Sequence, residues 1–297
     1  MGPVTDTHRV TYEENFKLAL QEGKPQFDDT FEYTSQVKGK QVQVTDIIGT
    51  SEARIDAPEG GPTPNMASQH EPVWMRPRRV DWGKLLSVED YIKSTNNFRS
   101  SYIMTGTKAM TRARNSILAS AVFGPRLIGN EVPTSSPWNG DTVAVDVGAD
   151  AATGMNVKKI LRALRLLEEA EITPEEEQLY LGLDPEEVEG LYYDLTYVSK
   201  DYRDRAQLED MTRRVTAIFG IPIVPTKRFS PVDPDGTTSV AALWCKSGMY
   251  WGEAMALDLK SAPAVGQQFR EQVYAEQWFA ATRTEDKKVI KILNKKA

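Results

Sequence analysis

Few residues in this chain are suited to catalysis or to binding a metal ion. The 297-residue sequence has one cysteine, Cys245, and two histidines, His8 and His70. A single cysteine excludes an intrachain disulfide and the usual zinc spacings, and it favours a reducing compartment. His8 lies in a predicted N-terminal arm and His70 in a polar loop, so neither is placed to be the base of a Cys–His dyad.

Other signals are also missing. No run of about 18 apolar residues predicts a membrane span, and the N-terminus lacks the apolar stretch of a secretory signal. Phosphate-binding, dinucleotide-binding and nucleophile-elbow motifs are absent. Asp233 and Asp235 lack the later ligands of a calcium loop, which favours a turn. The paired acids of residues 168–189 are interpreted as solvated surface, although some hydrolases use two acids without a local motif.

Charge is present but unevenly distributed. The net charge is −6, opposite in sign to that of a typical nucleic-acid-binding domain. Residues 141–210 hold 18 acidic and 7 basic side chains, whereas residues 71–125 hold 4 acidic and 9 basic ones. The last 15 residues hold 2 acidic and 6 basic side chains. Such blocks suit either subunits that meet through unlike surfaces or ordinary solvated faces.

Apolar spacing predicts helices over residues 8–22, 95–123 and 155–171, and a further one beginning at Asp184. The second would be roughly 40 Å long, with Gly106 inside it at some cost in helix propensity. Its expected buried stripe is Phe98, Tyr102, Ala109, Ala113, Ile117 and Ala121. The expected core face of the third is Val157, Ile160, Leu161, Leu164 and Leu167.

Strand patterns occur in blocks that do not alternate regularly with the helices. They cover residues 38–50, 73–82, 142–148, 178–183, 215–226, 238–251, 270–283 and 287–294. Blocks of this kind predict an α+β fold.

Residues 38–83 read as an extended hairpin with a long polar tip between its strands. Pro77 denies the return strand one hydrogen bond, which suits an edge or projecting strand. The return strand is rich in the tryptophans and arginines that dominate interface energetics; these are Trp74, Arg76, Arg78, Arg79 and Trp82. A two-stranded hairpin is marginal alone, so we expect these residues to contact another subunit.

Several stretches resemble the major capsid proteins of tailed double-stranded-DNA bacteriophages, which have the Hong Kong 97-like fold. They are an opening arm (THRVTYEENFKLALQEGK), an outgoing hairpin strand (GKQVQVTDIIGTSEA) and a return strand leading into a long helix (RPRRVDWGKLLSVEDYIKSTNNFRSSY). The end, AEQWFAATRTEDKKVIKIL, is similar to the family's closing G-A-T-R-x-x-D-x-x-V pattern, with Ala280 in place of the glycine.

The resemblance implies a role for each part of the chain. Residues 1–37 would be an N-terminal arm, 38–83 an extended loop lying across the adjacent subunit, and 84–133 a peripheral domain with a spine helix. Residues 134–269 would form a mixed α/β axial domain around fivefold and sixfold axes. Residues 270–297 would supply the closing strands.

The resemblance also implies the partners and the location. The subunit would form pentamers and hexamers of an icosahedral capsid shell in the virion, assembled in the host cytoplasm, with no enzyme activity, cofactor, metal or membrane. Because the chain begins at the arm, a separate scaffolding protein is implied, together with a portal protein and an optional decoration protein. Lys108, Arg112 and Arg114 on the long helix could face packaged double-stranded DNA without sequence preference, or form intersubunit ion pairs instead.

Two alternatives remain open on the sequence. An encapsulin-like compartment shell has the same fold and encloses protein cargo. A soluble oligomeric α+β hydrolase using paired carboxylates would be a different class of protein, distinguished by a compact dimer with a deep acidic cleft.

Overall fold

The structure is a computed structural model. It describes residues 23–35, 37–49, 70–86, 98–130, 132–173, 175–193, 217–229, 236–264, 266 and 270–296. The predicted helix at 8–22, the first residues of the helix predicted at 95–123, most of the polar tip and the turn at 230–235 lie outside these ranges.

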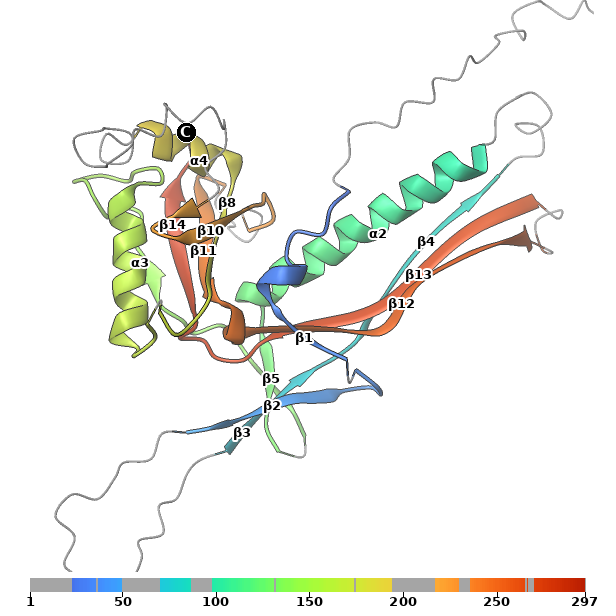
Figure 1. Ribbon diagram of the computed structural model, residues 1–297, viewed down its shortest axis with the longest axis horizontal. Coiled ribbons are helices and arrows are strands. Elements are labelled where there is room, and N and C mark those ends of the chain that lie inside the picture. The colour runs from blue at the N-terminus through green and yellow to red at the C-terminus, as the bar shows by residue number, and fades with distance from the viewer. Residues whose placement is uncertain are drawn as a thin grey trace, which may run out of the picture.

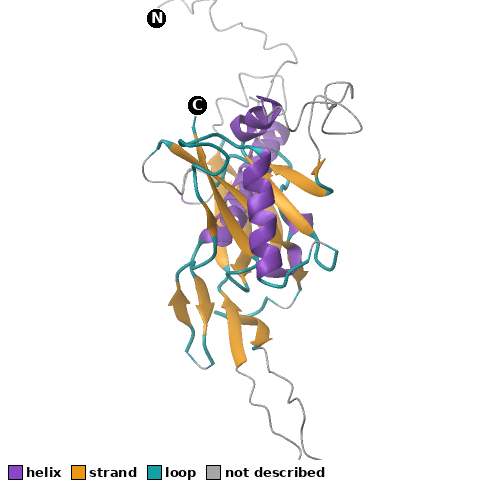
Figure 2. Cartoon of the chain, turned by 90° about the vertical axis from the view of Figure 1, so that its left-hand side faces the viewer, coloured by secondary structure: helices purple, strands orange, loops and turns teal. Residues whose placement is uncertain are grey.

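The strands of the described residues form three sheets, which confirms the mixed helix-and-strand class (Figures 1 and 2). A four-stranded sheet, which we call the peripheral sheet after the expected domain, has the order β1 (Glu32–Thr34), β12 (Met249–Ala264), β13 (Arg270–Arg283), β4 (Arg78–Leu85). A six-stranded sheet, which we likewise call the axial sheet, has the order β7 (Thr142–Val143), β14 (Val289–Lys295), β11 (Thr238–Cys245), β8 (Leu179–Leu183), β10 (Ile221–Pro225), β9 (Ala217–Ile218). A hairpin sheet has the order β2 (Val42–Ile48), β3 (His70–Met75), β5 (Arg126–Ile128), β6 (Thr134–Ser136).

The long helix α2 (Phe98–Phe123) runs along the peripheral sheet, beside β13 and β4 (Figure 1). The alternating burial of β13 explains this packing, since Val273 and Ala275 are buried while Tyr274 and Glu276, which follow them in turn, are half-buried. Odd-numbered side chains of this part of β13 therefore form the packed face of the sheet. The ladder between β12 and β13 shifts register twice between Glu253 and Asp258, in the stretch where the ribbon bends (Figure 1).

The axial sheet is covered on both faces. Leu181 and Leu243 belong to the cluster under helix α3 (Val157–Glu169), whereas Tyr180 and Trp244 belong to the cluster on the opposite face. All five residues of β8 are buried for this reason. Continuous apolar strands of this kind are expected where both faces of a sheet are packed.

Local caps define the two axial helices. The Asn156 side chain accepts a 2.9 Å hydrogen bond from the Lys159 backbone N–H at the start of α3. At the start of α4 (Pro185–Tyr193), the Glu187 carboxylate accepts a 2.8 Å bond from the Asp184 backbone N–H. This is half of a capping box, with Pro185 at the first helical position as the sequence predicts.

The segment predicted as one strand over residues 238–251 is two strands in different sheets. A single 3₁₀ turn, η5 (Lys246–Gly248), ends β11 in the axial sheet and starts β12 in the peripheral sheet. Strand β12 thus lies in the peripheral sheet, and β14 of the closing segment lies in the axial sheet. The domain bounds expected from the resemblance stay a prediction.

The described part of the predicted arm packs within its own chain. Phe27 and Phe31 are buried against Trp244, and β1 pairs with β12 in parallel. Three consecutive carbonyls of η2 (Asp28–Thr30) accept hydrogen bonds from aromatic side chains of the body. The donors are Trp251 to Asp28 at 3.2 Å, Tyr180 to Asp29 at 3.2 Å and Trp244 to Thr30 at 3.3 Å. Buried aromatic groups thus satisfy their polar tips on this segment.

The expected buried faces of two helices need correction. On α2 the fully buried side chains include Met110, Leu118 and Val122, whereas the expected Ala109, Ala113 and Ile117 are half-buried. The real stripe is displaced by one residue. On α3 Leu161 is 49% exposed, and the core position beside it is taken by Lys159, whose side chain is fully buried.

Gly106 is explained by a close contact between α2 and β4. A Cβ atom built on Gly106 would lie 2.6 Å from Cε3 of Trp82. Trp82 therefore lies directly against the helix backbone, and its indole fills a gap that only glycine leaves. The lower helix propensity of glycine is offset by this packing.

We predict that Gly106→Ala destabilises the subunit, although alanine is the better helix former. The added methyl must displace the indole, which typically costs about 1–3 kcal/mol. Denaturant unfolding of the unassembled subunit measures the effect. Ser116→Ala, at an exposed position of the same helix, is the control and should change stability by less than about 0.5 kcal/mol. Equal stability of both variants would contradict the packing role of Gly106.

Candidate assembly interface

The hairpin of β2 and β3 extends away from the body of the subunit (Figure 1). Its outer end presents Ile48, which is 63% exposed, and an exposed pair in which His70 Nδ1 lies 2.8 Å from Asp46 Oδ2. At its inner end Trp74 donates from Nε1 to the Gly129 carbonyl at 2.7 Å. The predicted contact residue Trp74 thus fixes the hairpin to its own chain through β3–β5 pairing and this bond.

The predicted return strand continues into the peripheral sheet as β4. Arg79 Nε lies 2.9 Å from Glu276 Oε1, and Arg79 Nη2 donates to the Tyr274 hydroxyl at 2.8 Å. These contacts raise the pKa of Arg79, first through the hydrogen bond to Tyr274 and then through the charge of Glu276. Arg79 and Trp82 are therefore engaged inside the subunit.

Arg76 and Arg78 differ from their neighbours. Both are exposed at the junction between β3 and β4. Within the described part of the chain, neither side chain has a hydrogen bond or an ion pair, although the Arg78 backbone pairs with Phe279. Among the five predicted contact residues, these two carry charge that no described side chain of the subunit neutralises.

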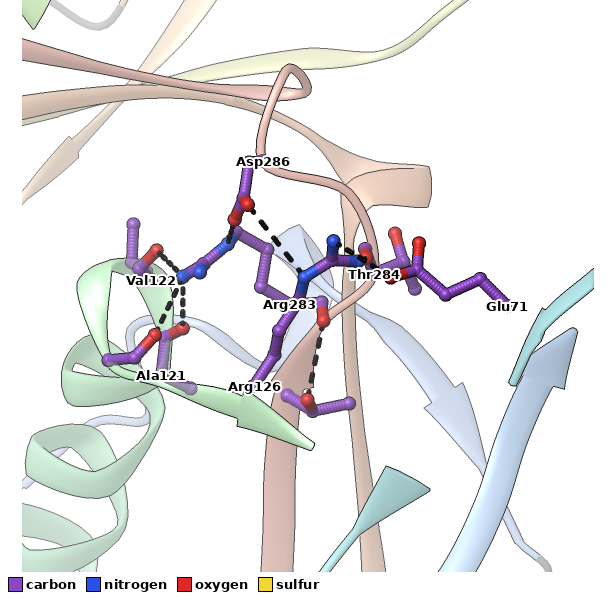
Figure 3. Close-up of polar contacts among 9 residues, drawn as sticks. Glu71, Ala121, Val122, Arg126, Arg283, Thr284 and Asp286 are labelled. Atoms are coloured by element: carbon purple, nitrogen blue, oxygen red, sulfur yellow. Dashed lines mark hydrogen bonds and ion pairs between the residues drawn. The ribbon is translucent and has the colours of Figure 1, made fainter. Parts of the chain in front are cut away.

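The hairpin, the long helix and the two larger sheets meet at a buried arginine, Arg283 (Figure 3). Its Nη1 donates to the carbonyls of Val122 at 2.7 Å and Gly124 at 2.9 Å, at the end of α2. Its Nε donates to Asp286 Oδ1 at 2.7 Å. The guanidinium thus satisfies carbonyls that a helix C-terminus leaves unpaired, and its positive charge suits the negative end of the helix dipole.

Arg126 on β5 extends this junction to the hairpin (Figure 3). It donates to the Thr284 carbonyl, and its Nη2 lies 3.3 Å from Glu71 Oε1 on β3. Its Nε lies 3.8 Å from Asp286 Oδ2. Burial lowers the pKa of Arg283, Asp286 opposes that shift, and the charge of Arg126 adds to it. Asp286 therefore lies close to both Arg283 and Arg126. Glu71 connects the hairpin to this cluster through its ion pair with Arg126.

The three candidate DNA-facing residues are not equivalent. Arg114 Nη2 lies 2.9 Å from Asp28 and Nη1 lies 3.1 Å from Glu253, while its guanidinium stacks 4.3 Å from the Trp251 ring centre. Its charge thus fastens the N-terminal segment to α2, and a role of Arg114 toward DNA stays a prediction. Lys108 and Arg112 are half-buried on the same helix.

The described residues also bear on catalysis. Cys245 is fully buried, and burial raises the pKa of its thiol to about 12. His70 lies on the hairpin beside Asp46, in a different sheet from Cys245. No group of three metal-ligating side chains is found in the described ranges, and no helix there is long and apolar enough to cross a membrane.

The family is decided by sequence. A family model described as "Phage capsid protein" matches residues 4–296. The chain belongs to the phage capsid protein family. It is a major capsid protein, a structural subunit of a phage shell. No curated protein sequence matches it.

Solved capsids establish the Hong Kong 97-like fold of this capsid subunit. The capsid of cyanophage P-SCSP1u is 14% identical, with a TM-score of 0.72 over 97% of this chain and 93% of that one. The cyanophage Pam1 capsid is 10% identical, with a TM-score of 0.68 over 100% and 98% of the two chains. A Mycobacterium phage Che8 chain is 13% identical, with a TM-score of 0.65 over 94% and 97%.

The sequence identified the closing motif but did not reveal the contacts that its residues make. Arg283 and Asp286 are the R and D of the R-x-x-D pattern, Val289 is its buried final valine, and Ala280 packs with Met75 and Val37. Arg126 was missed, because nothing in its local sequence distinguishes it from a solvated arginine after the Gly124-Pro125 helix stop.

We predict that Arg283→Met destabilises the subunit by about 3–5 kcal/mol, because it leaves Asp286 and the last carbonyls of α2 without their donor. Arg165→Met is the matched control: it breaks an exposed i,i+4 pair with Glu169 and should cost under about 1 kcal/mol. Denaturant unfolding compares the two. Equal losses would refute the central role of Arg283.

We also predict that Cys245 is unreactive in the folded subunit. At pH 8, below the thiol pKa of about 12, the group is protonated, and the thiolate is the reactive form. A colorimetric thiol reagent should label no cysteine in native protein and the single cysteine of the chain after guanidinium unfolding. Labelling at the same rate in both states would contradict this.

Proposed function

We propose that this capsid subunit forms an icosahedral shell around a packaged double-stranded DNA genome, with pentamers and hexamers built from its axial parts. The observation that carries the proposal is the projecting hairpin sheet, attached firmly at its base and exposed at its end (Figure 1). A ribbon fixed at one end presents a constant surface to a neighbouring copy. Many such contacts close a shell through multivalency even when each is modest.

The contact we assign to the junction is electrostatic. Arg76 and Arg78 would meet acidic surface of the adjacent subunit, consistent with the excess of acids in residues 141–210. Unlike surfaces of this kind guide association and select the correct partner. Trp74, Arg79 and Trp82 would support the contact from within the subunit by holding β3 and β4 in place.

DNA would meet this shell loosely. The chain carries a net charge of −6, so packaged DNA would be confined by the shell and would contact it only at local basic positions. Lys108 and Arg112 on α2 are the proposed positions.

The remaining partners follow from the family role. We propose that a separate scaffolding protein guides assembly in the host cytoplasm, that a portal protein occupies one vertex and that a decoration protein binds the finished shell. The subunit would act without enzyme activity. The buried, protonated Cys245 and the hydrogen-bonded Glu187 support this more than they support a hydrolase.

We predict that Arg76→Glu with Arg78→Glu leaves the subunit folded and prevents shell formation, because charge reversal places like charges across the contact. Arg76→Lys with Arg78→Lys is the matched control and should still assemble. Circular dichroism checks the fold, and sedimentation with negative-stain microscopy checks the shells. Normal shells from the glutamate variant would remove this junction from the assembly contact.

A further inference from the structure

The β9–β10 hairpin presents an aromatic side chain that the subunit leaves half uncovered. Phe219 is 50% exposed at the turn, whereas four other phenylalanines of the described residues are at most 1% exposed. The strands that carry the turn are fixed, because Ile218 and Ile221 pair with each other and are buried in the axial core. The hairpin therefore holds Phe219 in a constant position at the surface.

The backbone of this turn makes a phenylalanine unexpected there. Phe219 and Gly220 have φ values of 50° and 77°, so both residues are left-handed. Two-residue hairpin turns of this kind favour Asn-Gly, because a bulky residue is unfavourable at positive φ. No described atom lies within 4 Å of a Cβ built on Gly220, so the turn extends into open space. The chain thus keeps an exposed aromatic residue at a cost to its backbone, which indicates a contact outside the subunit.

Helix α3 offers a second exposed surface on the axial part. The helix lies outside the axial strands, at the left of Figure 1. Four of its outward side chains are exposed, and we call them the outer face of α3: Lys158, Leu161, Arg162 and Arg165. Leu161 is 49% exposed. It is therefore an apolar position flanked by the aliphatic stems and the charges of three cations.

The charges of α3 are not explained by the helix itself. Its first turn contains Lys158 and no acid, whereas its last turn contains Glu168 and Glu169 and no base. This order opposes the helix dipole, which favours acids at the N-terminus and bases at the C-terminus. Residues 141–210 hold seven basic side chains, and four of them belong to α3. The outer face is thus a cationic patch in an acidic region, so the axial part of a second copy offers it surface of opposite charge.

The hairpin turn and the outer face lie at different places on the axial sheet. Helix α3 packs against β14 and β7 at one edge of the strand order, and β9 forms the opposite edge. Four strand spacings separate β9 from β14, which is roughly 19 Å. A subunit therefore does not place Phe219 on its own α3, but two copies related by a rotation can bring the two together. Unlike surfaces that meet in this way repeat around an axis and close a ring.

We propose that Phe219 of one copy packs on the outer face of α3 of the next copy. The phenyl ring would cover Leu161, and the cations beside Leu161 would lie near the face of the ring, where they are attracted by its electrons. The inference rests on the proposed pentamers and hexamers, and it names the contact that joins their axial parts. An aromatic anchor surrounded by charged side chains is the usual composition of an interface hot spot.

Disulfide trapping tests the contact directly. Subunits with Phe219→Cys and Leu161→Cys should form, on mild oxidation, a ladder of reducible oligomers that ends at pentamers or hexamers on a non-reducing gel. Subunits with Phe219→Cys and Ser116→Cys, the latter at an exposed position of α2, are the matched control and should give no ladder. The native Cys245 is buried and present in both. No ladder from the first variant, or an equal ladder from the control, overturns the proposal.

The variant Phe219→Asn separates this contact from a role inside the subunit. Asparagine suits the positive φ, so the unassembled variant should be at least as stable as the wild type in denaturant unfolding. The subunit concentration needed for half-assembly, measured by sedimentation, should rise about tenfold or more, as for a hot spot. Phe219→Tyr keeps the ring and should assemble as the wild type does. A destabilised Phe219→Asn subunit, or one that assembles normally, overturns the proposal.

The contact and the proposed function fail in different ways. Wild-type shells combined with no cysteine ladder would overturn the contact and leave the shell function standing. A ladder from subunits that never form shells would support the contact and contradict the icosahedral shell.

Discussion

The architecture depends on one buried cation. Arg283 lies at the C-terminal end of the long helix, at the point where the chain leaves the peripheral sheet for the axial sheet. Beside it, Arg126 links the hairpin to both sheets. A guanidinium has enough donors, in a fixed plane, to serve a carboxylate and a helix terminus together. The hairpin, the peripheral sheet and the axial sheet thereby acquire one relative orientation, and Asp286 pairs with the two arginines that achieve it.

The aromatic residues of the N-terminal segment provide a second fastening between the same modules. Phe27 and Phe31 enter the cluster that joins the end of α2 to the axial sheet, while η2 is hydrogen-bonded from both sheets. Arg114 completes this attachment from the helix. The described portion of the predicted N-terminal arm, which was expected to contact a neighbouring subunit, therefore packs within its own subunit.

Elements with strong local signals were predictable from sequence, and the faces they bury were only partly so. The end of α2 follows from the breaker Gly124-Pro125, whereas α3, predicted over residues 155–171, begins after the Asn156 cap and spans Val157–Glu169. The buried stripe of α2 was misplaced by one residue, because small side chains occupy several faces of the helix. Leu161 was wrongly predicted to be buried. Lys159 is buried instead, because its ammonium donates to main-chain carbonyls that no local sequence pattern reveals. The sequence did not reveal that Trp82 packs within the subunit, because the residue it contacts, Gly106, lies 24 residues away in the chain. The Arg126 contact likewise joins residues that only the folded topology brings together.

The unbroken passage from β11 through η5 into β12 has a mechanical consequence. A force that pulls the axial sheet away from the peripheral sheet is transmitted along the covalent backbone of β11, η5 and β12. The hydrogen-bond ladders of β11 with β14 and of β12 with β13 oppose this force along the strand direction. Hydrogen bonds loaded along a strand fail together, whereas bonds pulled apart at a sheet edge unzip singly. Within each subunit, tension between the two sheets is therefore carried by covalent backbone.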